Sequence, residues 1–238
     1  MKYELETIPV WDALKTDTEC LLCVLEKRNE EKLTTFFLGE SVMDPDSRVA
    51  ANTLGFCPSH AEKLFDGDHK LGVALMTHTY LAGFLAEFKK KRRSADTAAD
   101  GKKGPSPLKE LLARPLNDCI FCRRLAETLD RYAYTVLYLY RKDPDFRKTL
   151  LTSKGFCVPH LLRLLEMTDR EMKGKERETF LSAILELEEK RFSVLEEEID
   201  WFTQKFDYRN REKPWGNSRD ALARTLQKLK GHRFLGKK

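Results

Sequence analysis

The sequence predicts an all-α protein of two tandem helical repeats, each closed by a Cys3His metal site, followed by a C-terminal helical tail. Apolar residues recur at steps of three and four, and no stretch alternates convincingly at period two. A Gly-Phe-Cys-x-x-His motif occurs twice, and each copy follows a Cys-x-x-Cys pair at nearly the same distance. Charged residues make up 34% of the chain, which favours long solvated helices.

The repeats are expected to occupy residues 1–93 and 108–207, with about four helices in each. At 238 residues the chain is long enough to bury a substantial core. Residues 94–107 are rich in Gly, Pro and Ser, a composition typical of a flexible linker. Residues 208–238 form a basic tail that has no counterpart after the first repeat.

A short helix is predicted to precede each Gly-Phe-Cys motif. Asp44 and Asp143 each stand before a proline, which places a good N-cap ahead of a residue suited to the first helical position. Gly55 and Gly155 are suited to end these helices in a left-handed conformation. Capping also explains the aspartates with fewer assumptions than acid–base catalysis does.

The longest uncharged segment runs from Leu71 to Ala86. It is too short to span a bilayer and is expected to be a buried helix, with His78 as a core histidine. The first residues of the chain carry charges rather than an apolar run, so we expect no secretory signal. Together these features predict a cytoplasmic protein with no membrane partner.

Six cysteines and two histidines form the candidate metal ligands. In a Cys-x-x-Cys pair at a helix start, two thiolates lie one turn apart, and the helix N-terminus favours the thiolate. The histidine three residues after the third cysteine lies one turn further along its own helix. The predicted ligands are Cys20, Cys23, Cys57, His60, Cys119, Cys122, Cys157 and His160.

The simplest pairing of these ligands joins the motifs within each repeat, and an exchange between repeats is the alternative. In the exchanged form, Cys20 and Cys23 would share an ion with Cys157 and His160. A disulfide framework is disfavoured, because three thiols cannot pair off within one repeat and no export signal is expected.

A closed Cys3His tetrahedron is the usual form of structural zinc, so two Zn(II) ions are the predicted cofactors. Iron–sulfur clusters are the alternative, because mixed Cys/His ligation can hold them as well. That alternative implies an electron-transfer or redox-sensing protein.

The tail concentrates positive charge, with eleven Lys or Arg against three Asp or Glu from Lys205 to Lys238, in a chain of net charge +5. Basic side chains interleaved with aromatic ones are typical of nucleic-acid or partner binding. Alternatively, the tail covers the end of the helical bundle. The candidate binding residues are Arg209, Arg211, Lys213, Trp215, Arg219 and Arg224.

No phosphate-binding loop, hydrolase motif or dinucleotide fingerprint is present in the sequence. No catalytic residue and no small-molecule substrate can be identified, and a non-enzymatic role is favoured. The sequence therefore predicts a zinc-stabilised helical module that binds an unknown protein or nucleic acid.

The paired motifs, together with the ending Lys-Phe-Asp-Tyr-Arg and Lys-Pro-Trp-Gly, resemble a family of uncharacterised bacterial proteins found mainly in anaerobic Firmicutes. The resemblance extends over essentially the whole chain. It implies a bacterial, cytoplasmic protein with two repeats, and it implies no activity.

Overall fold

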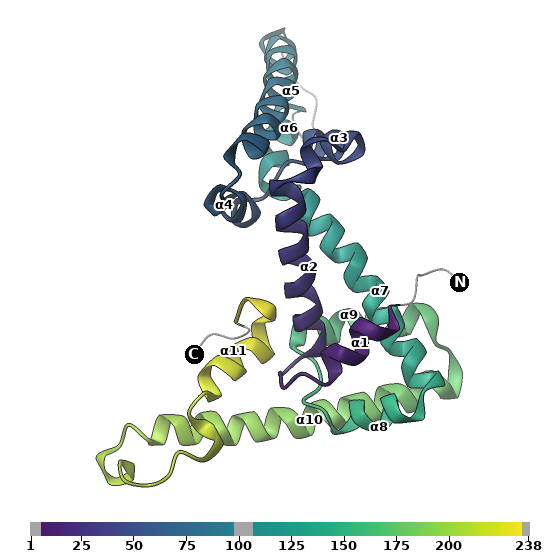
Figure 1. Ribbon diagram of the computed structural model, residues 1–238, viewed down its shortest axis with the longest axis vertical. Coiled ribbons are helices and arrows are strands. Elements are labelled where there is room, and N and C mark those ends of the chain that lie inside the picture. The colour runs from purple at the N-terminus through teal and green to yellow at the C-terminus, as the bar shows by residue number, and fades with distance from the viewer. Residues whose placement is uncertain (1–5, 98–106, 235–238) are drawn as a thin grey trace. The chain divides into compact units, whose positions relative to one another are not determined.

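The computed structural model describes residues 6–97 and 107–234, and every regular element in these ranges is a helix (Figure 1). The predicted all-α class is therefore confirmed. Short 3-10 turns accompany the α-helices at Glu40–Val42, Tyr208–Asn210, Gly216–Ser218 and His232–Phe234. The α-helices are α1 (Thr7–Leu14), α2 (Leu21–Leu38), α3 (Pro45–Leu54), α4 (Pro58–Asp66), α5 (Lys70–Thr97), α6 (Pro107–Asn117), α7 (Ile120–Lys142), α8 (Pro144–Thr152), α9 (Val158–Glu171), α10 (Gly174–Gln204) and α11 (Ala221–Lys230).

The two predicted helix caps are present. The backbone N–H of Ser47 donates to Asp44 Oδ2 at 3.1 Å, and that of Phe146 donates to Asp143 Oδ1 at 3.0 Å. Each bond satisfies one of the amides that a helix leaves unpaired in its first turn. Gly55 ends α3 as predicted, at a φ of +64°, a conformation that residues with a Cβ adopt only with strain. The prediction for Gly155 is wrong, because α8 ends at Thr152 with Ser153 as its C-cap, and Gly155 follows in the turn at a φ of +77°.

The chain divides into two compact units whose bounds differ from those of the predicted repeats. Unit 1 comprises Met1–Arg28 and Glu127–Lys238, and unit 2 comprises Asn29–Ala126. The boundaries fall inside α2 and α7, so each unit contains segments from both predicted repeats. The predicted linker, 94–107, lies for the most part outside the described residues.

In unit 1 the core lies among α1, the start of α2, α7, α8, α9 and α10. Its fully buried side chains include Val136, Phe146, Phe156 and Phe180. Trp11 anchors α1 by donating to Asp143 Oδ2 at 3.1 Å and by packing edge-on against Phe146. The lead-in segment is thus part of the unit that holds the second Gly-Phe-Cys motif.

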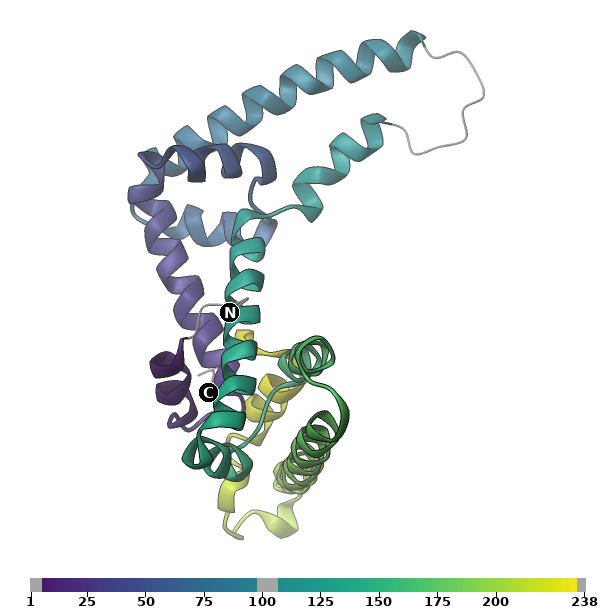
Figure 2. The same ribbon diagram turned by 90° about the vertical axis from the view of Figure 1, so that its right-hand side faces the viewer.

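In unit 2 the core is smaller and rich in aromatic rings. Phe37 and Phe121 are fully buried and pack against Phe56, and Leu64 and Met76 close the cluster. Figure 2 shows α5 and α6 running beside each other in this unit.

The expectation that the segment 71–86 is buried is wrong. Only 6% of the apolar window in Lys70–Arg93 is buried, and His78 is exposed rather than a core histidine. The elements packed on α5 lie on one side of it, where they bury Met76, and no described element covers its other side.

Candidate metal centres

The eight predicted ligands form two groups of four, and each group lies within one unit. Site A comprises Cys20, Cys23, Cys157 and His160 in unit 1. Site B comprises Cys57, His60, Cys119 and Cys122 in unit 2. Within each site the donor atoms all lie within 4.8 Å of one another.

Local structure presents these ligands in the same way at both sites. The Cys-x-x-Cys pairs stand at the starts of α2 and α7, so each pair spans one helical turn. Cys57 and Cys157 are the N-cap residues of α4 and α9, both with extended backbone. His60 and His160 follow in the first turn of those helices, on the same side as the cysteine.

Site A is enclosed. Its three cysteines are fully buried and His160 is 3% exposed. His160 Nδ1 lies 3.3 Å from Cys20 Sγ, 3.5 Å from Cys23 Sγ and 3.2 Å from Cys157 Sγ. The Sγ atoms of Cys23 and Cys157 are 3.5 Å apart.

Site B has nearly the same geometry but is open on one side. His60 Nδ1 lies 3.1 Å from Cys57 Sγ, 3.4 Å from Cys119 Sγ and 3.5 Å from Cys122 Sγ. The Sγ atoms of Cys57 and Cys122 are 3.8 Å apart. Cys119 and His60 are buried, whereas Cys57 is half-buried and Cys122 is exposed.

These spacings fit one tetrahedral ion in each site. Zn–S bonds of about 2.3 Å and Zn–N bonds of about 2.0–2.1 Å place sulfur donors about 3.8 Å apart and sulfur and nitrogen about 3.6 Å apart. The contacts given above lie within about 0.5 Å of those values. All six cysteines are free thiols, and sulfurs 3.5 or 3.8 Å apart are too distant for a disulfide, whose S–S bond is about 2.05 Å.

The pairing of motifs is the exchanged one, which corrects the preferred prediction of ligation within each repeat. Cys20 and Cys23 meet the second Gly-Phe-Cys motif, and Cys119 and Cys122 meet the first. The cause is the length of the intervening helices. α2 has 18 residues and α7 has 23. The far end of the helix therefore lies about 27 Å from the Cys-x-x-Cys pair in α2 and about 34 Å from it in α7. The nine- or ten-residue helix that follows spans about 15 Å at most.

Each ligand histidine also contacts a carboxylate through its other ring nitrogen. His60 Nε2 lies 3.0 Å from Glu30 Oε1, and His160 Nε2 lies 3.3 Å from Glu26 Oε2. Such a contact fixes the tautomer that leaves Nδ1 free to bind a metal and makes that nitrogen more basic. Neither glutamate was predicted from the sequence, although they lie one and two turns after Cys23 on the same face of α2.

The electrostatics lower the pKa of one thiol in site A (Cys20) and of two in site B (Cys57 and Cys119), and raise the pKa of the remaining thiols. Burial is the largest influence on the pKa of Cys119 and raises it, but the hydrogen bond from His60, two backbone hydrogen bonds and the charge of His60 together outweigh burial and lower that pKa to about 6. Burial and the charge of Cys119 raise the pKa of Cys122 to about 12. In site A, burial opposes ionisation of Cys20, yet hydrogen bonds from Cys157 and Cys23 hold its pKa well below the usual value. A divalent cation supplies the charge that three adjacent thiolates require.

A buried ion pair from the tail holds the second Gly-Phe-Cys turn in place. Lys228 Nζ lies 2.7 Å from Glu188 Oε2 and donates to the carbonyl oxygen of Lys154 at 2.6 Å. Glu188 Oε1 accepts the backbone N–H of Phe156 at 2.6 Å. Both charged side chains are almost completely buried, so the pair fixes the residues directly before Cys157. The sequence carried no clear signal for this pair.

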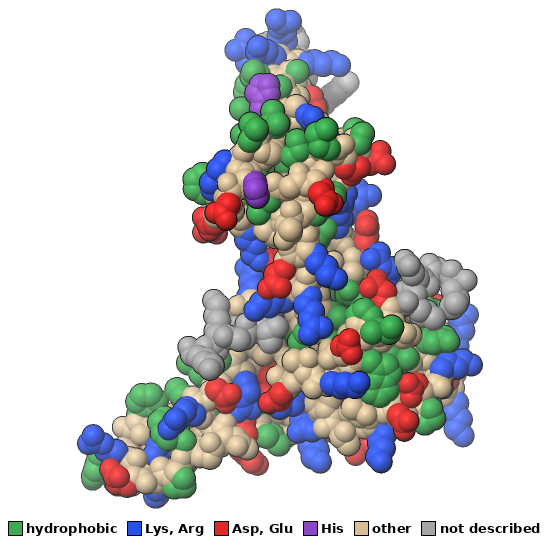
Figure 3. Space-filling view, in the orientation of Figure 1, with side chains coloured by type: hydrophobic (Ala, Val, Ile, Leu, Met, Phe, Trp, Pro, Cys, Tyr) green, Lys and Arg blue, Asp and Glu red, His purple; other side chains and the backbone are tan. Residues whose placement is uncertain are grey.

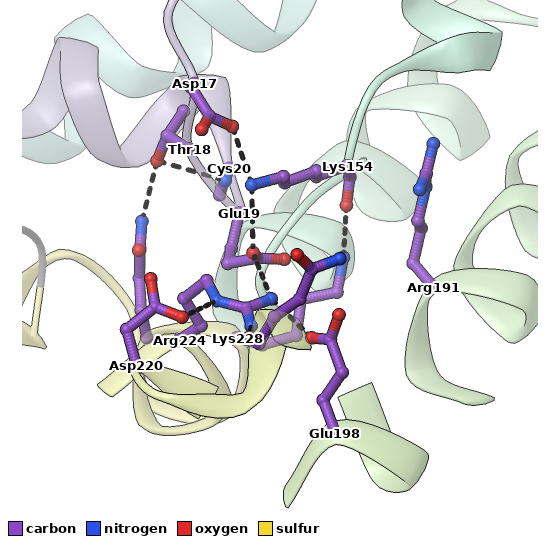
Figure 4. A network of polar contacts seen from close by, with 12 residues as sticks. Asp17, Thr18, Glu19, Cys20, Lys154, Arg191, Glu198, Asp220, Arg224 and Lys228 are labelled. Carbon is purple, nitrogen blue, oxygen red and sulfur yellow. Dashed lines mark hydrogen bonds and ion pairs between the residues drawn. The ribbon is translucent and has the colours of Figure 1, made fainter. Parts of the chain in front are cut away.

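A more exposed network continues from this pair to the segment before Cys20 (Figure 4). Arg224 Nη1 lies 2.6 Å from Glu198 Oε2 and 3.5 Å from Glu19 Oε1. Lys154 Nζ lies 2.6 Å from Asp17 Oδ1. The tail therefore contributes charged groups that connect both ligand segments of site A to α10 and α11.

The six candidate binding residues of the tail do not form one free basic surface. Arg224 lies in the network just described, and Arg209 pairs with Asp207 at 2.6 Å. Trp215 is half-buried against Phe202, with Lys205 Nζ over its ring. Lys213 donates to Asn210 Oδ1, and Arg211 and Arg219 are exposed.

The chain belongs to a family of unknown function, DUF6062, whose sequence model matches residues 1–234. The resemblance described from the motifs is thereby confirmed. The chain is also 27% identical over 195 residues to an "Uncharacterized 23.9 kDa protein in xynA 3'region" of Caldicellulosiruptor sp. (strain Rt8B.4). That alignment covers 82% of this chain and 85% of the relative. No solved structure matches the chain.

Proposed function

We propose that the chain is a non-enzymatic helical protein stabilised by two structural Zn(II) ions, one in site A and one in site B, and that it acts as a protein-binding module. The observation that carries the metal assignment is the meeting of three thiols and one imidazole around a single point, twice, with ligand spacings suited to one small ion.

A structural role is supported by the completeness of each ligand set. Catalytic zinc sites use three protein ligands and keep a fourth position for water or substrate. Sites A and B each offer four protein donors, which fill a tetrahedron. Site A is also closed to solvent, so that a substrate could not reach an ion there.

The spacing of donors supports a single ion over an iron–sulfur cluster. In a four-iron cluster each protein ligand binds a different iron atom, so the ligands must surround the whole cluster. Donors within 4.8 Å of one another surround one ion instead. The free thiols also suit a reducing compartment such as the cytoplasm.

A protein partner is favoured over a nucleic acid, because basic side chains of the tail already form ion pairs within the chain. Binding along a phosphate backbone needs several cationic groups that are free to neutralise phosphates. Arg209 and Arg224 are already paired with carboxylates. A shift of mixed RNA or DNA at low salt that Arg211→Ala and Arg219→Ala abolish would reverse this preference.

Metal analysis of anaerobically purified protein tests the proposal. The expected result is a colourless protein with two equivalents of zinc per chain, reduced to one by Cys119→Ser. A brown protein with visible charge-transfer absorption and iron would overturn it in favour of the electron-transfer or redox-sensing alternative.

A further inference from the structure

One face of α5 is apolar, and no element among residues 6–97 and 107–234 covers its central part. Between Leu71 and Ala86 the chain has no charged residue, although 34% of all its residues are charged. Seven exposed residues on one side of the helix form this surface, the α5 face: Leu71, Ala74, Leu75, His78, Leu81, Ala82 and Leu85. Its four leucines are 73%, 40%, 59% and 47% exposed in chain order. A contiguous apolar stripe of this kind is typical of an interaction surface.

The order of residues on the α5 face is the same in both directions. From His78, a leucine lies three residues away on each side (Leu75 and Leu81), and Leu71 and Leu85 lie seven residues away. The alanines, 74 and 82, lie four residues away on each side. An antiparallel pair of identical helices related by a two-fold axis at residue 78 would place each of these side chains against one of its own kind.

We propose that the α5 face binds the α5 face of a second copy of the chain, antiparallel, with the two-fold axis at His78. In this pairing Leu71 of each chain packs against Leu85 of the other, and Leu75 packs against Leu81. The contact buries the seven side chains of each copy and leaves no unpaired charge inside the stripe.

The charges that flank the two ends of α5 favour an antiparallel pairing. Lys89 and Lys90 begin a basic run at the C-terminal end, and Asp66 and Asp68 stand just before the N-terminal end. Antiparallel pairing brings the basic C-terminal end of each α5 toward the segment that precedes the other copy's α5. Figure 3 shows the hydrophobic side chains along α5 and the Lys and Arg side chains gathered at its end.

A groove beside the N-terminal half of the α5 face provides space for the partner's side chains. It has a volume of about 500 Å³ and is lined by Leu38, Val42, Leu71 and Leu75, among others. In the proposed register the residues that approach it are Leu85 and Leu81 of the second copy, which are apolar and exposed in the single chain.

A membrane fits the surroundings of α5 less well than a second copy does. By length and hydropathy Lys70–Arg93 passes as a membrane-spanning helix. The opposite side of α5, however, carries Glu87, whose carboxylate forms a two-bond pair with Arg114 of α6 at 3.0 and 2.9 Å. Entry into a bilayer would bury this pair or break it, and both outcomes are unfavourable because the two charges would lose their hydration or their partner.

Light scattering coupled to size-exclusion chromatography tests the proposal on the full-length, metal-loaded chain. The wild type should elute at twice the 27.7 kDa mass of one chain. Leu81→Glu should raise the dissociation constant of the dimer at least about 100-fold, because it buries two unpaired carboxylates. Leu162→Glu, at a comparably exposed leucine in unit 1, should leave the dimer unchanged.

The register is tested by a charge swap within one chain. Leu71→Lys should weaken the dimer, and the addition of Leu85→Glu should restore it. In the double variant, the lysine at position 71 of each copy faces the glutamate at position 85 of the other, so two ion pairs form per dimer. The mismatched double variant Leu71→Lys/Leu81→Glu should remain monomeric. Equal masses for both double variants would exclude this register.

Two results would overturn the proposal. One is a monomeric wild type at every concentration tested. The other is binding of a monomeric chain to phosphatidylglycerol vesicles that Leu81→Glu abolishes, which would assign the face to a lipid surface. Both readouts are independent of which metal the two sites bind.

Discussion

Cys119 Sγ lies 3.4 Å from His60 Nδ1, although the two residues belong to different copies of the paired motifs. The same exchange brings Cys20 Sγ to 3.3 Å from His160 Nδ1 in the other unit. Each unit therefore depends on ligands from two distant parts of the sequence. Removal of a single ligand should affect the unit in which its partner lies, not the repeat in which it is encoded.

Pairs of ligand substitutions should reveal the exchange directly. The variant Cys20→Ser/Cys157→Ser damages only site A and should keep one equivalent of metal. The variant Cys20→Ser/Cys57→Ser damages both sites and should lose both equivalents. Elemental analysis of the two purified proteins distinguishes the pairings, because ligation within each repeat predicts the opposite result.

The two sites should release metal at different rates. Site B has one exposed and one half-buried cysteine, whereas all four ligands of site A are buried. A chelator can attack the open site directly, but the closed site first requires local unfolding. Release to a chromophoric chelator should show two phases of equal amplitude with rates at least roughly tenfold apart. The fast phase should disappear in Cys119→Ser, and release in one phase from the wild type would contradict the prediction.

The carboxylates behind the histidines should strengthen metal binding. Glu30→Gln removes the negative charge that His60 Nε2 contacts, and we expect a loss of about 10–100-fold in the affinity of site B. Glu26→Gln should do the same at site A. Glu31→Gln, at an exposed position on the same helix, is the control and should change neither site. Competition against a chelator of known affinity measures each effect.

The buried pair between the tail and α10 should be important for the stability of unit 1. Glu188→Gln leaves the Lys228 ammonium buried without its counter-ion and should cost about 3–5 kcal/mol of the free energy of unfolding. Glu186→Gln, exposed on the same helix, should change stability by less than about 0.5 kcal/mol. Hydrogen exchange of unit 1 amides measures both changes.

A double substitution separates the cost of an unpaired buried charge from the loss of the hydrogen bond to the Phe156 amide. In Glu188→Met/Lys228→Met both charges are replaced by apolar side chains, and we expect most of the stability to return. If the double variant is as unstable as Glu188→Gln, the hydrogen bond to the Phe156 amide is the more important contact.

Local pattern was sufficient to predict the helical class, both aspartate caps and the eight residues that gather in the two sites. These features depend on residues a few positions apart, such as the three-residue spacing of Cys57 and His60 within one helical turn. The two copies of each motif are nearly identical, however. Their spacing alone could not show which Cys-x-x-Cys pair meets which Gly-Phe-Cys turn.

The surroundings of each segment were decided by tertiary packing. A charge-free helix is equally compatible with a buried position and with an exposed one. The placement of α3, α4 and α6 decided that Leu71 and Leu81 are exposed. Likewise, the residue type alone predicts that the Lys228 ammonium is exposed to solvent. It is buried because α11 packs on α9 and α10, where Glu188 compensates its charge.

The sequence by itself determined which side chains can bind metal and that helices present them. The tertiary structure alone decided how the ligands combine, which site is open and which apolar face remains free. The physical reason is the range of the forces involved. Helix periodicity and capping act within one or two turns, whereas the partner of a helix end is set by helix length and by packing between residues 59 to 140 positions apart.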